Sequence, residues 1–483
     1  MPDDAGDDRG GPGPRRAEFG VDLLLDLRGA PGRKALGDAL RAAARDGRLH
    51  AGAVLPSTRT LASELGLARN TVAAAYEQLV AEGWLISRQG SGTRVADHPA
   101  LGAGLPARGR DPDGSARLRF DFTPGTPDLS RFPRERWQRA ARRALARAPH
   151  GALSYPDPRG LPGLREALAE YLARARGVRA DAEHIVICSG FTQALHLLAG
   201  VLRSRDATRI AVEDHGLPRH RRVIAAAGLD TTAVPVDREG ARVDLLAGED
   251  AVLLTPAHQF PLGVALSSRR RLGVLRWARR TGALLIEDDY DGEFRYDRQP
   301  VAALQADAPD LVAYAGTASK SLAPGLGLAW LVCPPGLLSD VVRAKEVSDG
   351  HTGVFEQLTL EEFLRCGDYD QHVRRARLAY RRRRNDLLAM LTDRSLPAVP
   401  RGIGAGLHVL IDLPARSAEA ETTVVRAATR HDIALTGLSH YRTPPDPDAS
   451  VAALVIGYTR PPGHGYRAAL DALGGFLTTA LAR

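Results

Sequence analysis

The chain has 483 residues, a length that favours two or three domains. Hydrophobic residues make up 44% and charged residues 25%, which is the composition of a globular protein, and the longest apolar runs are far too short to span a bilayer. The net charge of +8 permits a nucleic-acid partner without requiring one. Cys188, Cys333 and Cys366 have neither metal-ligand nor disulfide spacing, and the acidic N-terminus has no signal segment. We therefore expect a cytoplasmic protein without a metal site.

Residues 1–20 are mostly Gly, Pro, Asp and Arg, so we expect a disordered tail. Residues 21–97 are patterned as a small helical domain. One helix is predicted over Gly32–Asp46. A second begins at Ser57 or Thr58 after Pro56 and ends at Gly66. A third opens at Ala68 and ends near Gly83. Its predicted buried side chains are Val72, Tyr76, Leu79 and Val80.

Two hairpin strands are predicted after these helices, Trp84–Arg88 and Thr93–Val95, around a glycine-rich turn. Two short helices joined by a tight turn and followed by a hairpin predict a winged helix-turn-helix. Several polar residues lie at the helix starts and on the wing, where they could grip phosphates or reach base edges. They are Ser57, Thr58, Arg59, Arg69, Asn70, Thr71, Gln89, Gly90, Gly92 and Thr93.

The alternative for this region is a small helical domain that binds protein. Its charge supports that caution, because residues 22–97 hold ten Lys/Arg against eight Asp/Glu. The sequences Leu55–Leu67, Arg69–Val72 and Gly83–Val95, however, closely resemble the signature of the GntR family of bacterial regulators. That resemblance implies binding to a double-stranded DNA operator.

Residues 98–118 have the Pro/Gly-rich composition of a linker, and residues 119–483 are predicted to form a second domain. Apolar runs alternate there with amphipathic helices, which predicts an α/β domain with a largely parallel sheet. The predicted strands are His184–Cys188, Arg209–Val212, Thr231–Val236, Ala251–Thr255, Ala283–Glu287, Leu311–Ala315 and Leu328–Val332. The predicted helices between them are Thr192–Leu202, His220–Ala227 and Ser268–Arg279. A helical stretch, Leu337–Leu391, leads into a smaller α+β part with strands in Leu407–Leu413 and Val451–Tyr458 and a closing helix, His464–Leu481.

Lys320 is one of only three lysines among 65 basic residues, and it follows a predicted strand in a hydroxyl-rich loop. Arginine cannot act as an amine nucleophile, whereas a desolvated lysine can form a Schiff base with an aldehyde. A surface charge is the plainer interpretation of this residue.

Other strand ends carry groups that suit the same chemistry, because ligands bind at the carboxyl ends of parallel strands. Pyridoxal phosphate needs a lysine, a carboxylate for its ring nitrogen, a helix start for its phosphate and a hydroxyl beside its ring oxygen. The candidates are Lys320, Asp288, the loop Gly190–Phe191–Thr192 with Thr317, and Tyr290. Asp288 as half of a buried ion pair and Gly190 as a plain helix-start glycine are the structural alternatives.

The second domain resembles the pyridoxal-phosphate-dependent fold-type I aminotransferases from about Phe120 onward. Its fusion to a GntR winged helix resembles the MocR subfamily, on the motifs Thr255–Gly263, Ile286–Tyr296 and Gly316–Pro324. The resemblance implies a homodimer built through this domain. It also implies cofactor contacts from His258 and Ser319 in addition to the candidates above.

Several positions depart from the family pattern. Gly327 and Leu328 stand where an arginine normally clamps the phosphate, and Leu217 where an aromatic ring normally stacks on the cofactor. Leu262 replaces a small hydroxyl residue. Residues 453–456 lack the arginine that grips a substrate carboxylate, although Arg460 lies nearby.

The leading hypothesis is therefore a DNA-binding transcriptional regulator whose aminotransferase-like domain binds pyridoxal phosphate and senses an amine or amino acid. An active aminotransferase with an accessory winged helix is one alternative. A regulator whose degenerate pocket no longer binds the cofactor is the other.

Overall fold

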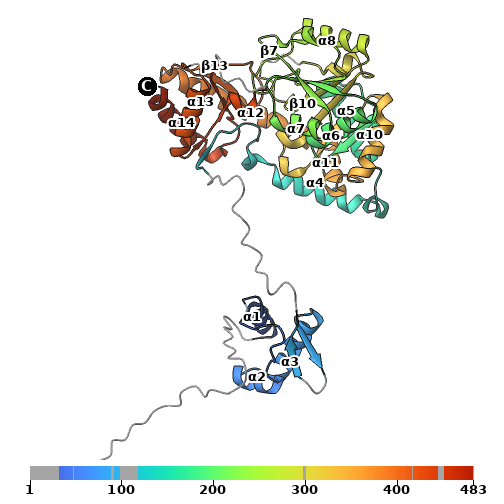
Figure 1. The fold of residues 1–483 in the computed structure, drawn as a ribbon, viewed down its shortest axis with the longest axis vertical. Helices are drawn as coiled ribbons and strands as arrows, with labels where there is room; N and C mark the ends of the chain where they lie inside the picture. Colours follow the sequence, from blue (N-terminus) through green and yellow to red (C-terminus); the bar gives the residue numbers. More distant parts are fainter. Residues whose placement is uncertain are drawn as a thin grey trace, which may run out of the picture. The chain divides into compact units, whose positions relative to one another are not determined.

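The computed structural model describes residues 32–46, 48–88, 92–97, 118–296, 301–415, 417–443 and 451–481 (Figure 1). The predicted tail, residues 98–117 of the predicted linker, and the wing residues Gln89 and Gly90 lie outside these ranges. The chain divides into two compact units, Met1–Ala116 and Arg117–Arg483.

The first unit is a winged helix-turn-helix, with α1 (Arg33–Arg45), α2 (Thr58–Leu65), α3 (Arg69–Ala81) and the antiparallel strands β1 (Leu85–Arg88) and β2 (Gly92–Val95). The Ser57 hydroxyl caps α2 by accepting the Thr60 N–H at 3.1 Å, and Gly66 ends it in a left-handed conformation. Leu36, Leu61 and Val72 are fully buried in a shared core. The expected burial of Val80 is wrong, since 37% of it is exposed and Leu79 fills the inward position of the last turn.

The second unit contains a seven-stranded sheet in the order β4-β12-β11-β10-β9-β5-β6. Its strands are β4 (Ile185–Cys188), β5 (Arg209–Glu213), β6 (Asp230–Val234), β9 (Ala251–Leu254), β10 (Leu284–Asp289), β11 (Val312–Thr317) and β12 (Ala329–Val332). All are parallel except β12, which runs antiparallel to both of its neighbours. The predicted α/β fold and all seven predicted strands are confirmed.

Helices cover both faces of this sheet, because successive side chains of each strand point to opposite faces. On β4, Val186 and Cys188 pack with α6 (Phe191–Ser204) and α10 (Pro335–Ser348), whereas Ile185 and Ile187 pack with α5 (Pro162–Arg176) and α11 (Val354–Arg365). The helices of this part are α4 (Arg134–Arg147), α5 (Pro162–Arg176), α6 (Phe191–Ser204), α7 (Pro218–Ala226), α8 (Ser268–Thr281) and α9 (Ala318–Ser321).

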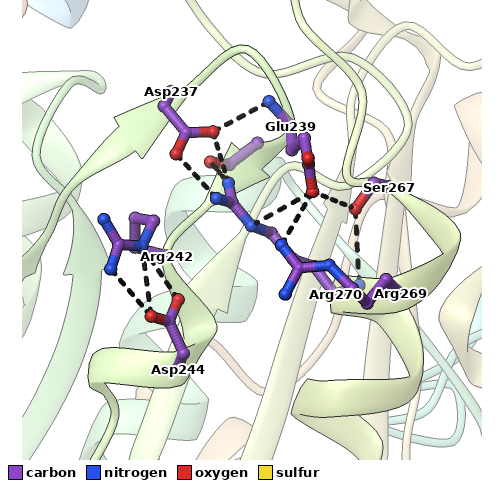
Figure 2. A network of polar contacts seen from close by, with 8 residues as sticks. Asp237, Glu239, Arg242, Asp244, Ser267, Arg269 and Arg270 are labelled. Atoms are coloured by element: carbon purple, nitrogen blue, oxygen red, sulfur yellow. Dashed lines mark hydrogen bonds and ion pairs between the residues drawn. The ribbon is translucent and has the colours of Figure 1, made fainter.

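A polar network fixes the short hairpin of β7 (Val236–Asp237) and β8 (Gly240–Ala241) to α8 (Figure 2). The buried guanidinium of Arg270 donates from both terminal nitrogens to the Asp237 carboxylate at 2.6 Å. Because Arg270 lies in the first turn of α8, this contact holds the hairpin against the start of that helix.

The expected helical stretch Leu337–Leu391 is three helices, α10 (Pro335–Ser348), α11 (Val354–Arg365) and α12 (Asp368–Asp393). Gly367, at a φ of 75°, turns the chain between α11 and α12.

The smaller C-terminal part follows. It holds an antiparallel sheet of β13 (Val399–Arg401), β14 (Val409–Asp412), β17 (Ala453–Ile456) and β16 (Thr436–Gly437), with α13 (Ala418–Arg430) and α14 (Tyr466–Leu481). β3 (Phe120–Asp121) pairs with β15 (Ile433–Ala434). No helix in the described ranges is long and apolar enough to cross a membrane.

Candidate functional site

A cavity of about 880 Å³ lies at the carboxyl ends of the parallel strands. The loops that follow β4, β5, β9, β10 and β11 all contribute to its wall, as does the segment Pro124–Thr126. The sheet therefore brings together strand-end residues that are far apart in the sequence.

Lys320 lines this cavity from α9, the single turn that follows β11. Its Nζ donates a hydrogen bond of 2.6 Å to the carbonyl oxygen of Gly125. Burial lowers the pKa of Lys320, while the carboxylates of Asp288 and Asp291 oppose that shift. A lowered pKa makes the neutral, nucleophilic amine easier to reach.

Asp288 also lines this cavity, and it is only 6% exposed. Burial raises the pKa of its carboxyl well above the ordinary value, and the charge of Lys320 acts in the opposite direction. Within the described ranges no residue forms a hydrogen bond with this carboxylate. A buried carboxylate without a donor is costly, so its position suits a ligand that brings an N–H to it.

The other acids at the end of β10 do have partners. Asp289 accepts two hydrogen bonds from the buried guanidinium of Arg176, at 2.6 and 3.0 Å, and a third from the Tyr314 hydroxyl at 2.7 Å. Glu287 accepts two backbone N–H groups, at 2.9 and 3.1 Å. The cost of burying this acidic run is thus offset at its neighbours but not at Asp288.

Tyr290 lines the cavity, and its hydroxyl lies 3.2 Å from Nδ1 of His258. That nitrogen is also 2.8 Å from the Asp291 carboxylate. His258 itself is buried behind Tyr290 and does not line the cavity. Burial raises the pKa of Tyr290 well above its usual value, so the hydroxyl stays protonated and can donate a hydrogen bond.

The start of α6 faces the cavity through Gly190, Phe191 and Thr192. No side chain caps this helix start, so its first N–H groups can meet an anion. Gln193 fixes the loop, since its Oε1 accepts the Ser189 N–H at 2.8 Å and its Nε2 donates to Asp349 at 2.6 Å. The hydroxyls of Thr317 and Ser319 also line the cavity and lie 2.9 Å apart.

Comparison with known proteins agrees with both units. Residues 121–450 match the family model "Aminotransferase class I and II", and residues 33–95 match "Bacterial regulatory proteins, gntR family". The pyridoxine biosynthesis transcriptional regulator PdxR of Corynebacterium glutamicum is 34% identical, over 82% of this chain and 85% of its own length. The probable rhizopine catabolism regulatory protein MocR of Rhizobium meliloti is 33% identical, over 76% and 79%. The chain belongs to the MocR-type GntR regulators.

Solved aminotransferases share the fold of the second unit. Kynurenine aminotransferase from Pyrococcus horikoshii superposes with a TM-score of 0.67 at 23% identity, covering 76% of this chain and 92% of that one. The α-aminoadipate aminotransferase LysN of Thermus thermophilus gives 0.65 at 26% identity, covering 76% and 97%. The second unit of this MocR-type regulator thus has the aminotransferase fold. The term effector domain is used below only as the name of this unit, residues 117–483.

Of the positions that depart from the MocR pattern, some lie at the cavity and others lie outside its wall. Gly327 has a φ of 59°, and a Cβ added there would lie 3.6 Å from the Ser189 carbonyl, so a side chain would start beside the α6 cradle. Leu217 lines the cavity, whereas Leu262 packs with Phe260 behind it. Arg460 pairs with Asp121 at 2.7 Å and lies outside the cavity wall.

Sequence reasoning missed two residues of α7 in the cavity wall, His220 and Arg221. His220 lines the cavity with its ring 4.8 Å from that of Phe191, and burial, with the charges of Lys320 and Arg221, lowers its pKa to about 3. Arg221 is half-buried in the same wall and has no ion pair or hydrogen bond among the described residues. Burial lowers its pKa. In so arginine-rich a chain, one more arginine carries no sequence signal.

Glu213 was also missed. It is the last residue of β5 and lines the cavity, where its carboxyl accepts hydrogen bonds from the Thr255 hydroxyl at 2.6 Å and from Gln259 Nε2 at 3.1 Å. Burial raises the pKa of Glu213 to about 7 despite these donors.

In the winged helix, the predicted DNA-binding side chains of Arg59, Arg69 and Asn70 are exposed at the starts of α2 and α3. Thr58 and Thr71 are partly buried there, and the Ser57 hydroxyl is engaged as the cap of α2. Gly92 and Thr93 begin β2.

Proposed function

We propose that the effector domain of this transcriptional regulator binds pyridoxal phosphate at Lys320. We further propose that an amine or amino acid arriving at the cofactor changes the affinity of the protein for DNA. The observation that carries the proposal is that one cavity wall holds both Lys320, whose amine can act as a nucleophile, and Asp288, a buried carboxylate without a hydrogen-bond donor among the described residues.

Different residues of the cavity are suited to bind different parts of this cofactor. Asp288 is suited to keep the ring nitrogen protonated, and the Tyr290 hydroxyl is suited to donate a hydrogen bond to the ring oxygen. The N–H groups of Phe191 and Thr192, with the Ser319 hydroxyl, are suited to the phosphate. When bound, the cofactor would supply an aldehyde carbon that reacts with primary amines. Lys320 would hold it through Nζ, and an incoming amine would compete with Lys320 for it.

Arg221 is suited to replace the missing phosphate arginine. It is a half-buried cation of the cavity wall, it belongs to the helix whose His220 contacts Phe191, and it has no partner among the described residues. An uncompensated cation in such a position is stabilised when an anion arrives.

Sensing is favoured over catalysis by the C-terminal part. Residues 453–456 form the buried apolar strand β17, and Arg460 is engaged by Asp121, so neither presents a guanidinium to the cavity. A ligand alters DNA binding only if it binds two states of the protein unequally. Release of the Lys320 amine is a change that could supply that difference.

We also propose a homodimer formed through the effector domain. Tyr155 is 92% exposed, and Val347 and Phe355 are also largely exposed. The ring of Tyr155 lies 6.1 Å from that of His351, which is four residues before Phe355 in the chain. A second copy of the chain would remove this apolar surface from water.

The test is to titrate the purified protein with pyridoxal phosphate and follow visible absorbance. We expect a saturable band that is absent in Lys320→Ala. DNA affinity is then measured with the cofactor alone and with the cofactor plus a panel of primary amines and amino acids. The arm with cofactor alone is needed because the relative PdxR is named for pyridoxine biosynthesis. No band at millimolar cofactor would leave the degenerate-pocket alternative standing.

A further inference from the structure

A second cationic surface lies on the effector domain, away from the cofactor cavity. Two hollows of about 550 and 380 Å³ adjoin each other, because both are lined by Arg131, Arg375 and Gly463. They lie between the short helix η2 (Leu129–Arg131), the start of α4 and the middle of α12. We call them the arginine groove, after the arginines that line it: Arg131, Arg134, Arg136, Arg375, Arg382 and Arg383.

Four of these guanidinium groups are uncompensated. Among the described residues, Arg131, Arg134, Arg375 and Arg382 have no ion pair, while Glu135 is the one acid in the lining of the groove. Arg131 and Arg375 are close enough to His372, on the floor of the groove, to lower its pKa, although burial is the larger cause. Like charges held this close repel each other, and an anion in the groove would relieve that repulsion.

The floor of the groove is rigid. Arg383 is buried and donates to the Asp128 carboxylate at 2.6 Å and to two backbone carbonyls at 2.8 and 2.9 Å. His372 lies 2.7 Å from the Ser321 carbonyl, next to Lys320 in the chain. The groove is therefore preformed, with a fixed floor and a rim of free arginines.

The distribution of charge identifies the occupant. Residues 1–117 hold 16 Lys/Arg against 15 Asp/Glu, whereas residues 118–483 hold 49 against 42. The unit that carries the winged helix is thus nearly neutral, although electrostatic attraction to phosphates supplies much of the affinity of a DNA-binding protein. The basic excess of this chain lies in the effector domain.

We propose that the arginine groove is a second DNA-binding surface, which contacts the phosphodiester backbone of the duplex that the winged helix recognises. Its contacts are to phosphates and therefore add affinity without reading sequence. Arg131 and Arg375, shared by both hollows, are central to it.

The full-length protein is tested against a fluorescent 40-base-pair duplex of arbitrary sequence by anisotropy at several salt concentrations. Each phosphate contact contributes about 0.9 to the slope of log K against log salt. The variant Arg131→Gln/Arg375→Gln should reduce the steepness of that slope by about 1.8, or roughly 60-fold in affinity at 0.1 M salt if the curves converge at 1 M. Arg131→Lys/Arg375→Lys, which keeps the charge, should restore most of the slope.

The control is Arg238→Gln/Arg280→Gln, which removes the same charge from exposed positions outside the groove. Equal slopes for the groove variant and this control would overturn the proposal, since only net charge would then matter. A weaker slope in the groove variant that lysine does not restore would also overturn it. Titration of the same variants with pyridoxal phosphate separates the two proposals, because neither arginine lines the cofactor cavity.

Discussion

Replacement of Arg221 by glutamine should weaken the binding of pyridoxal phosphate. The guanidinium is half-buried in the cavity wall and has no partner among the described residues, so the change removes a ligand contact without breaking an internal one. A hydrogen bond to a charged group contributes about 1.5–3 kcal/mol. The dissociation constant should therefore rise roughly ten- to a hundredfold.

Arg222→Gln is the matched control. Arg222 is exposed on the same helix, one residue further along, and does not line the cavity. Visible absorbance titration of both variants gives the two dissociation constants, and thermal unfolding shows whether the fold is kept. We expect Arg221→Gln to unfold at the temperature of the wild type or slightly above it, because a desolvated cation is removed. Equal cofactor affinity in the two variants would refute the assignment of Arg221 to the phosphate.

Gly327→Arg provides a second arm in the Arg221→Gln background. A guanidinium restored beside the α6 cradle gains about 1.5–3 kcal/mol of contact. A side chain at position 327 must also adopt the left-handed conformation that Gly327 has, at a cost of about 1–2 kcal/mol. That strain is present with and without the cofactor, so it lowers the stability of the fold and leaves the expected recovery of affinity at roughly ten- to a hundredfold. A double variant that binds no better than Arg221→Gln alone would mean that the loop does not hold the new guanidinium at the cradle.

Four other changes test the remaining parts. Arg69→Ala should cost about 1–3 kcal/mol of specific DNA binding in a gel shift at fixed salt, with folding unchanged, if it reads a base edge. Arg176→Met should destabilise the effector domain by about 3–5 kcal/mol in urea, and adding Asp289→Asn should recover part of that loss, because the unpaired buried charge is removed. Glu213 has a raised pKa of about 7 in the folded protein, so between about pH 4.5 and 7 the folded state binds more protons than the unfolded state. The free energy of unfolding therefore falls as pH rises through this range, and Glu213→Gln should make that fall shallower in thermal melts at several pH values. Wild type should sediment as a dimer at micromolar concentration, and Tyr155→Asp should shift it toward monomer.

The fold was largely predictable because most strands of the main sheet are short, continuous apolar runs that are buried on both faces; the edge strand β6, with Asp230 and two threonines, is the exception. The run Val312–Thr317 and its neighbours stand out from the arginine-rich helices around them. The helical stretch after Leu337 was harder, because hydrophobic period does not show where Gly367 turns the chain. Val80 was misplaced because periodicity alone does not distinguish the last inward position of a helix from its neighbour.

The cofactor-facing residues were predictable only where residue type was unusual. Lys320 stood out in a chain whose basic residues are nearly all arginine. Asp288 stood out as part of an acidic run that directly follows a buried apolar strand. The carbonyl of Gly125, which accepts the Lys320 amine, has no signal in sequence because every residue carries one. Arg221 and Arg131 were missed for a related reason, since arginine is common in this chain and only the structure shows which guanidinium groups lack a partner.

The pattern of kept and lost contacts fits a reversible sensor. A covalent site with a complete phosphate clamp, a stacking ring and a carboxylate arginine spends its interactions on holding cofactor and substrate through a reaction. Here the amine of Lys320 and the carboxylate of Asp288 are kept. Gly327 and Leu217 occupy the positions of the phosphate-clamping arginine and of the stacking ring, and neither can make those contacts. Under the proposed function, each lost contact would lower cofactor affinity toward the range in which occupancy follows supply. A regulator responds only where occupancy changes, because a site that is always full shifts no equilibrium between its states.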